Sequence, residues 1–347
     1  MSEAGSNRRP LLPVAAPDDA GGDDLASQSI RTDFDCDNEI WYQDGTIILI
    51  AQGTGFRVYR GMLAERAEIF RDILSIPQPP DTQLAFGCPV VHLSDTAIAL
   101  REFLNALFRE ERYSPTSDVD LAKLSYRIRL SHKYGAEKLL KRSIQELQKL
   151  YPTDYSSVQH RQFYSSGIPR GIVAANLADL TNTSSVLPSA LYSCCQLPDE
   201  MLFEGTVLPD GTVERLSRDN LLRCSRAKAK LAFRHAQSIH EIFSHEDSQD
   251  CLDNSLCRDD TRIARDAVLD GRGVEGGETD ALAPLGAFFS EYRYAFSDGA
   301  YRCGHCMSAL YAREVAAHNA VWKHLPSYMG VKVEGWGDKA EDSDLDV

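Results

Sequence analysis

Four of the nine cysteines form two pairs in the last third of the chain, and they are the residues best suited to chemistry. Five residues separate Cys251 from Cys257, and two separate Cys303 from Cys306. Two cysteine pairs joined by a long excursion can close a tetrahedral thiolate site for one zinc ion. Such a site would be structural, because protein ligands fill every position. The alternative that these are four ordinary cysteines stays open.

Two further hypotheses use the Cys303–Cys306 pair. A redox dithiol requires that the pair open a helix after a buried parallel strand, and the preceding "EYRYAFSDGAY" contains a turn and little extended pattern. A Cys2His2 finger would add His318 and His324. Six positions apart on an unbroken helix, those histidines would point about 120° away from each other.

The other motifs do not indicate catalysis. Cys194, Cys195 and Cys224 lie in apolar helical contexts and are predicted to be buried. The glycine spacing at 271–276 matches a dinucleotide fingerprint, but no strand leads into it. The sequence contains no nucleophile elbow, P-loop or zinc-protease motif. We therefore expect a protein that is not an enzyme.

Composition narrows the class of partner. The net charge of −14 argues against nucleic acid or an anionic membrane, which both favour basic surfaces. The longest apolar run, "IILIA" at 47–51, is far too short to span a membrane. The N-terminal residues lack the apolar core of a signal peptide. We expect a cytoplasmic or nuclear protein whose cysteines are thiols or metal ligands.

The first half has the pattern of an α+β domain. Residues 1–33 are predicted to be a disordered arm, and residues 34–152 a domain. Its expected elements are strands at 46–53 and 55–60, a helix at 61–75, a strand at 89–93, and helices at 94–110, 117–135 and 136–152. We expect Ser94 or Asp95 to cap the helix at 94–110, and Gly135 to end the one at 117–135.

The second half is predicted to be a mostly helical region over 153–330, followed by an acidic disordered tail at 331–347. A flexible loop is expected at 271–284, between the last two helices. The expected helices cover 170–181, 187–197, 217–243, 258–269 and 308–324. The two cysteine pairs would tie the loop to the body of this region.

Several segments of the first half resemble BTB/POZ domains, and more narrowly the BTB proteins of mushroom-forming fungi. These are "DGTIILIA", "FRVYRGMLA", "IFRDILSIPQPP" and "CPVVHLSD", in this order. The resemblance implies a helical cluster capped by a short sheet, which serves dimerisation and docking without catalysis. It implies a homodimer or a dimer with another BTB protein. The C-terminal cysteine pairs also resemble pairs in these fungal proteins.

The resemblance also implies an interface at the strand-to-helix junction. Asp44 and Arg60 match a charged pocket near the two-fold axis, and the alternative that both are ordinary surface charges stays open. Met62 and Leu63 would leave apolar surface for a second chain. The chain departs from the pattern at Tyr59, commonly His, and at Ala67, often Ser.

An alternative function is a substrate adaptor that recruits a cullin of a ubiquitin ligase. The hydrophobic-x-Glu element that some family members use for this has no clear counterpart in "IPQPPDTQLAFGCP".

Overall fold

The computed structural model describes residues 33–76, 84–109, 120–157, 169–244, 250–270, 279–285 and 303–337. Most of the predicted arm at 1–33, most of the predicted loop at 271–284 and the tail beyond Gly337 lie outside these ranges. From Phe34 onward the chain belongs to one unit of contacts.

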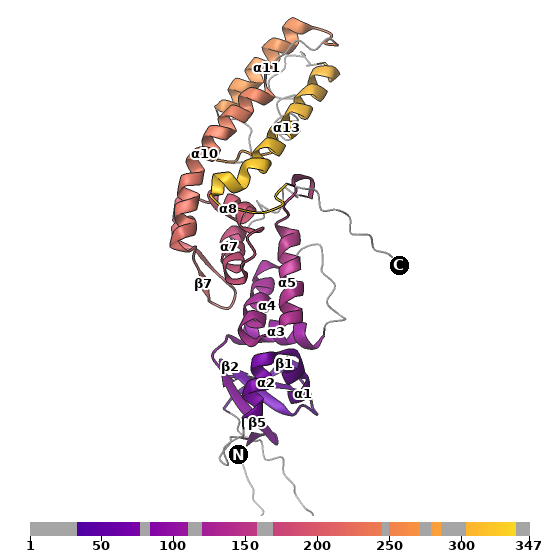
Figure 1. Ribbon diagram of the computed structural model, residues 1–347, viewed down its shortest axis with the longest axis vertical. Helices are drawn as coiled ribbons and strands as arrows, with labels where there is room; N and C mark the ends of the chain where they lie inside the picture. The colour runs from indigo at the N-terminus through magenta and orange to yellow at the C-terminus, as the bar shows by residue number, and fades with distance from the viewer. Residues whose placement is uncertain are drawn as a thin grey trace, which may run out of the picture. The chain divides into compact units, whose positions relative to one another are not determined.

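The structure is a mixed α+β fold (Figure 1). The first half contains β1 (Asp35–Trp41), β2 (Ile47–Ala51), β3 (Thr54–Val58), α1 (Arg60–Arg66), α2 (Glu68–Ser75), β4 (Leu84–Ala85), β5 (Cys88–Leu93), α3 (Ala97–Phe108), α4 (Leu121–Tyr134) and α5 (Glu137–Leu150). The second half contains η2 (Tyr155–Ser157), α7 (Arg170–Thr181), α8 (Leu187–Cys195), α9 (Asp199–Glu204), β6 (Thr206–Val207), β7 (Val213–Glu214), α10 (Arg218–Ile242), α11 (Asn254–Leu269) and α13 (Gly304–Met329). The predicted α+β class and helical second half are confirmed.

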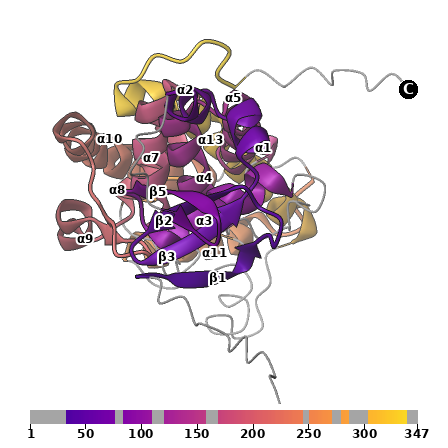
Figure 2. The same ribbon diagram turned by 90° about the horizontal axis from the view of Figure 1, so that it is seen from below.

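The sheet of the first half has the strand order β1-β3-β2-β5-β4 (Figure 2). β2 and β3 form the expected hairpin, and β5 pairs in parallel with β2. The hairpin turn places both Gln52 and Gly53 at positive φ, 48° and 76°. Turns of this kind match the right-handed twist of the strands they join. All five residues of β2 are buried, so apolar packing covers both of its faces.

The helix predicted at 61–75 is two helices, which corrects the sequence interpretation. Ala67 leaves helical geometry with φ −137° and ψ 111°, and it separates α1 from α2. The Glu68 backbone N–H then donates to the carbonyl of Gly135 at 3.3 Å. The break turns the buried face of α2 onto α4, where Phe70 stacks on Tyr134 with ring centroids 4.3 Å apart. Tertiary contact therefore outweighs the continuous helical pattern.

Strand β1 was not predicted, because its "DCDNEIW" sequence carries little apolar alternation. It pairs in parallel with β3. Buried Asp37 accepts a hydrogen bond from the side chain of Arg101 at 2.7 Å, and its other oxygen accepts from the backbone of Ile40. An ion pair between this buried carboxylate and the half-buried Arg101 joins the strand to α3.

The cap predicted for α3 is also corrected. Thr96, rather than Ser94 or Asp95, accepts the N–H of Ala99. Asp95 is engaged elsewhere, because it accepts from Lys133 and from the hydroxyl of Tyr134. The expected C-cap at Gly135 is confirmed, with φ 67°.

The helices of the second half match their predicted positions with two extensions. α11 begins at Asn254 because Asp253 caps it, accepting from the N–H of Leu256. α13 runs through Pro326, which cannot donate to the carbonyl of Trp322. The indole N–H of Trp336 donates to that carbonyl instead, at 2.8 Å. The short elements α9, β6 and β7 were not predicted.

The buried apolar side chains form one large core and two smaller ones. The large core extends from the sheet through α3, α4, α7 and α8 to the first half of α10 and the last part of α13. A second, separate core lies among the end of α10, α11 and the first part of α13. The third packs against the other face of the sheet.

Candidate metal centre

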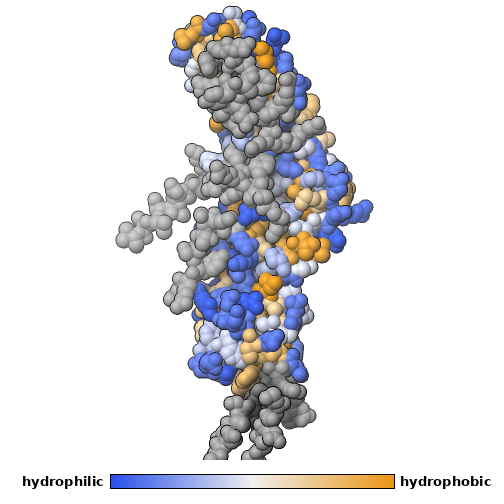
Figure 3. All heavy atoms as spheres, turned by 180° about the vertical axis from the view of Figure 1, so that it is seen from behind, coloured by the Kyte–Doolittle hydropathy of each residue, from blue (hydrophilic) through white to orange (hydrophobic). Residues whose placement is uncertain are grey.

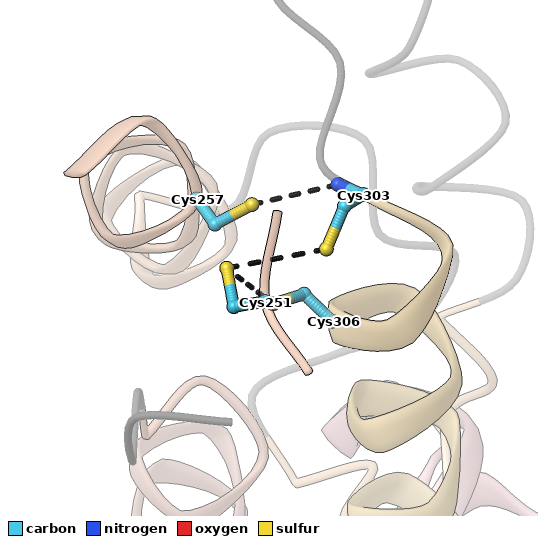
Figure 4. A group of neighbouring side chains, drawn as sticks. All are labelled: Cys251, Cys257, Cys303 and Cys306. Carbon is cyan, nitrogen blue, oxygen red and sulfur yellow. Dashed lines mark hydrogen bonds between the residues drawn. The ribbon is translucent and has the colours of Figure 1, made fainter. Parts of the chain in front are cut away.

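Two helix starts position the four predicted cysteines (Figure 4). Cys251 lies just before α11 and Cys257 in its first turn, where the Asp253 cap fixes the local backbone. Cys303 is the N-cap residue of α13, and Cys306 follows in the first turn. Each pair therefore presents its sulfurs from the beginning of a helix.

The four sulfurs converge on one point. The Sγ atoms of all four cysteines lie within 4.8 Å of one another. The Cys251 sulfur lies 3.4 Å from that of Cys306 and 4.0 Å from that of Cys303. Zinc–sulfur bonds of about 2.3 Å in a tetrahedron place the sulfurs about 3.8 Å apart. These four cysteines therefore lie close enough to hold a metal ion.

Burial makes the site asymmetric. Cys257 and Cys306 are buried, whereas Cys251 and Cys303 are half-buried. The backbone N–H of Cys303 donates to the Cys257 sulfur at 3.4 Å. An ion at the centre would be enclosed by thiols on every side, which is the geometry of a closed structural site.

The thiols differ in acidity. Backbone N–H groups of Leu252 and Cys306 point at the Cys303 sulfur and lower its pKa to about 6. Desolvation raises the pKa of Cys306, and a hydrogen bond with Cys251 adds to the effect. Burial also raises the pKa of Cys257. Metal binding requires thiolates, so it would release protons from this group.

The histidines of the predicted finger do not join the cluster. His318 is buried, and its Nδ1 lies 3.0 Å from the hydroxyl of Tyr155. His324 is exposed on the same unbroken helix. The Cys2His2 hypothesis is therefore wrong, because α13 carries these side chains away from the sulfurs.

For the redox hypothesis, the pair does open a helix, as a dithiol site requires. The segment before it, residues 286–302, lies outside the described part of the chain. The sulfurs of this pair face a second cysteine pair.

Cys194, Cys195 and Cys224 are buried elsewhere in the large core, as predicted.

Asp44 and Arg60, the residues predicted for a charged pocket at the strand-to-helix junction, contact different groups of their own chain. Asp44 accepts a hydrogen bond from the Tyr59 hydroxyl at 2.7 Å. The Arg60 guanidinium donates to the carbonyl of Leu74, and its backbone N–H donates to the Thr46 hydroxyl at 2.9 Å. Both charged residues are exposed.

The predicted apolar surface at this junction needs a correction. Leu63 is fully buried in the core of its own chain, so it does not face a partner. Its helix turns it inward, into the same core as Phe70 and Leu74 of α2. Met62 is half-buried.

Exposed apolar side chains occur instead in the segment from α2 to β4. We call Ile69, Ile76, Leu84 and Phe86 the α2–β4 apolar residues; they are 41%, 62%, 64% and 38% exposed. The sequence could have indicated that two of them are exposed, because the helical spacing places Ile69 and Ile76 away from the buried face of α2, which carries Phe70 and Leu74. Figure 3 shows apolar atoms interspersed with polar atoms on one face of the molecule.

No protein-family model matches the chain, and a search of curated proteins finds no match.

Among the described helices, none combines the length and apolar character that crossing a bilayer demands.

Proposed function

We propose that this chain is a partner-binding protein that dimerises through its α+β region. The carrying observation is the exposure of the α2–β4 apolar residues, of which Leu84 lies in β4, a strand at the edge of the sheet, and Phe86 directly follows it. Exposed edges and apolar side chains are common sites of chain association. The resemblance to BTB/POZ domains supports a second copy, or another BTB protein, as the partner. Asp44 and Arg60, both exposed, are candidates for polar contacts across that interface.

Light scattering after size exclusion tests the dimer. The intact chain should elute as a dimer at micromolar concentration. A double variant with Ile76→Asp and Leu84→Asp should elute as a monomer, because it places charges among the α2–β4 apolar residues. Phe233→Asp is the matched control, since Phe233 is 67% exposed on α10, and it should leave the dimer intact. A monomeric intact chain would contradict the proposal.

We further propose that Cys251, Cys257, Cys303 and Cys306 hold one structural zinc ion. The sulfur spacing and the all-thiol donor set favour zinc. Such an ion would join the starts of two helices, and the protein would not use it in a reaction. Cytoplasm or nucleus would suit the site, because thiols there stay reduced.

Metal analysis of the purified chain tests the zinc. We expect about one zinc ion per chain, and fewer than about 0.2 would overturn the site. Cys251→Ser with Cys306→Ser should abolish binding. Cys36→Ser is the control, because Cys36 is exposed and lies outside the cluster.

Partner recruitment could extend to a cullin, which would make the protein a ligase adaptor. Co-elution of the purified chain with a purified cullin would favour the adaptor function. Separate elution of the two proteins would leave dimerisation and docking as the function.

A further inference from the structure

A layer of buried polar side chains separates the large core from the second core. On α10, Leu231 belongs to the large core and Ile239 to the second core. On α13, Ala317 belongs to the second core and Val321 to the large core. Both helices therefore pass from one core to the other. The polar residues that are buried or half-buried between these points are Arg234, His235 and Ser238 on α10, and His318 on α13. Three half-buried alanines, Ala232, Ala236 and Ala320, accompany them, and buried Glu314 lies one turn before His318 on α13.

Segment 279–285 passes through the same polar layer and adds the buried carboxyl group of Asp280. The Asp280 carboxylate accepts a hydrogen bond from the Tyr192 hydroxyl, and its second oxygen has no partner among the described residues. The Glu314 carboxylate accepts the backbone N–H of Leu285 at 2.7 Å. The His235 ring hydrogen-bonds the backbone of Asp280.

This polar layer weakens the coupling between the two cores. Most of its side chains hydrogen-bond to the backbone or to the tyrosines Tyr155 and Tyr192, and they do not interdigitate as apolar side chains do. The hydroxyl of buried Ser238 has no partner among the described residues. Apolar packing transmits cooperativity through a fold, so a break in it allows one side to open while the other stays closed.

Among the described residues, the second core is small. It has nine buried members there, three of them alanines: Ile239, Ile242, Phe243, Ala264, Ala267, Val268, Leu285, Leu310 and Ala317. Clusters of this size supply little apolar burial, and small folded units usually need disulfides or metals. The structure records no disulfide; each of the nine cysteines is a free thiol.

The four-cysteine site adjoins this core. Its ligands lie at the starts of α11 and α13, and Cys257 is followed on α11 by the core residues Ala264 and Val268. Figure 1 shows α11 and the beginning of α13 at the same end of α10. Across the core, the Arg313 side chain donates to the Ile242 carbonyl at 2.9 Å. The metal would thus supply a cross-link that the second core needs.

We propose that metal binding controls the folding of this end of the molecule, and that the polar layer confines its unfolding there. We call the unit the metal-dependent end: α11, residues 239–242 of α10 with the following Phe243, and residues 304–317 of α13. The inference rests on the proposed zinc site. Without the metal, this end opens and exposes its apolar side chains, while the large core stays folded.

Hydrogen exchange on the full chain tests the proposal, with and without a chelator, and with zinc content measured on the same samples. Chelation should speed amide exchange about 100-fold or more in α11 and residues 304–317. Exchange in α4, in the α10 residues 218–231 and in the α13 residues 321–329 should change less than about threefold. The Cys251→Ser, Cys306→Ser double variant should reproduce this pattern without chelator, and Cys36→Ser should not.

The outcomes separate the inference from the site on which it rests. A purified chain that neither contains nor takes up zinc would overturn the site and the inference together. Zinc that binds and leaves with no change in exchange would overturn the inference and keep the site. Faster exchange throughout both cores would also overturn it, because the polar layer would then not confine the opening.

Discussion

The large core and the metal-dependent end show two ways of holding helices together. The large core gathers fully buried side chains from the sheet and from helices throughout the chain. The second core, most of which lies in the metal-dependent end, has nine buried members among the described residues, and four clustered thiols lie beside it. In the first region apolar burial is sufficient, whereas in the second a few close contacts must carry the fold. The comparison predicts that the two regions respond differently to the same kind of change.

The largest effect is expected from a cavity in the large core. Phe103 is fully buried against Tyr134, so Phe103→Ala should lower the free energy of unfolding by about 3–5 kcal/mol. Urea denaturation measures this loss. Leu310→Ala is the counterpart in the second core; it should change exchange in α11 and leave the urea midpoint almost unchanged. Equal shifts of the midpoint would mean that the two regions unfold as one.

The next effect tests whether the ion pair between Asp37 and Arg101 stabilises the region that contains the large core. Arg101→Ala leaves the buried Asp37 carboxylate without its charged partner, which lies 2.7 Å away. Removing one partner of such a pair should cost about 3 kcal/mol, seen in urea denaturation. Arg71→Ala is the control, because its pairs with neighbouring acids are exposed. A loss no greater than the control's would show that Asp37 reaches solvent.

A smaller effect concerns pH and the polar layer. Burial raises the pKa of Asp280 from 3.8 to about 7, in a site faced by Tyr192, His235, Tyr155 and Glu314. The folded chain therefore favours the neutral carboxyl. Its stability contribution is complete below about pH 4 and is lost as the pH rises to about 7.

Asp280→Asn removes this titration. The variant should be more stable than the intact chain at pH 8, by about 2 kcal/mol after allowance for local relaxation, and equally stable near pH 4. Thermal or urea denaturation at both pH values measures the difference. Unchanged pH dependence in the variant would show that Asp280 is not the titrating group.

The smallest effect concerns a helix cap. Thr96→Ala should cost about 1 kcal/mol, because Thr96 accepts the N–H of Ala99 and also donates to Asp210 at 2.8 Å. Ser94→Ala should be nearly neutral, since Ser94 is exposed and is not the cap. If urea denaturation showed a larger loss of stability for Ser94→Ala than for Thr96→Ala, Ser94 would be the cap, as the sequence predicted.

Hydrophobic period and capping residues predicted most of the helices. The 3.6-residue pattern located α4, α5 and α10 because each buries one side against a neighbour, whereas α7 and α8 are apolar stretches buried on most sides. The same pattern did not predict the helix break at Ala67, where the backbone N–H of Glu68 donates a hydrogen bond to the carbonyl of Gly135. It also failed for β1, because a strand held by the Asp37 ion pair needs few apolar residues.

The candidate metal centre was predictable as residue types and not as geometry. Spacing alone marked Cys303 and Cys306 as a pair, while the five-residue gap between Cys251 and Cys257 was ambiguous. Their convergence depends on the packing of α11 and α13 beside α10. That packing also excludes His318 and His324, which the sequence left as alternative ligands.

The sequence by itself determined the α+β class, the expectation that the cysteines are thiols rather than disulfides, and the four candidate ligands. These follow from local pattern and composition, which every short segment carries independently of its neighbours. Only the tertiary structure decided that Leu63 is internal, that two cores meet at a polar layer, and that four sulfurs lie within 4.8 Å. Contacts between residues far apart in the chain are set by how whole helices pack, and no local pattern encodes that packing.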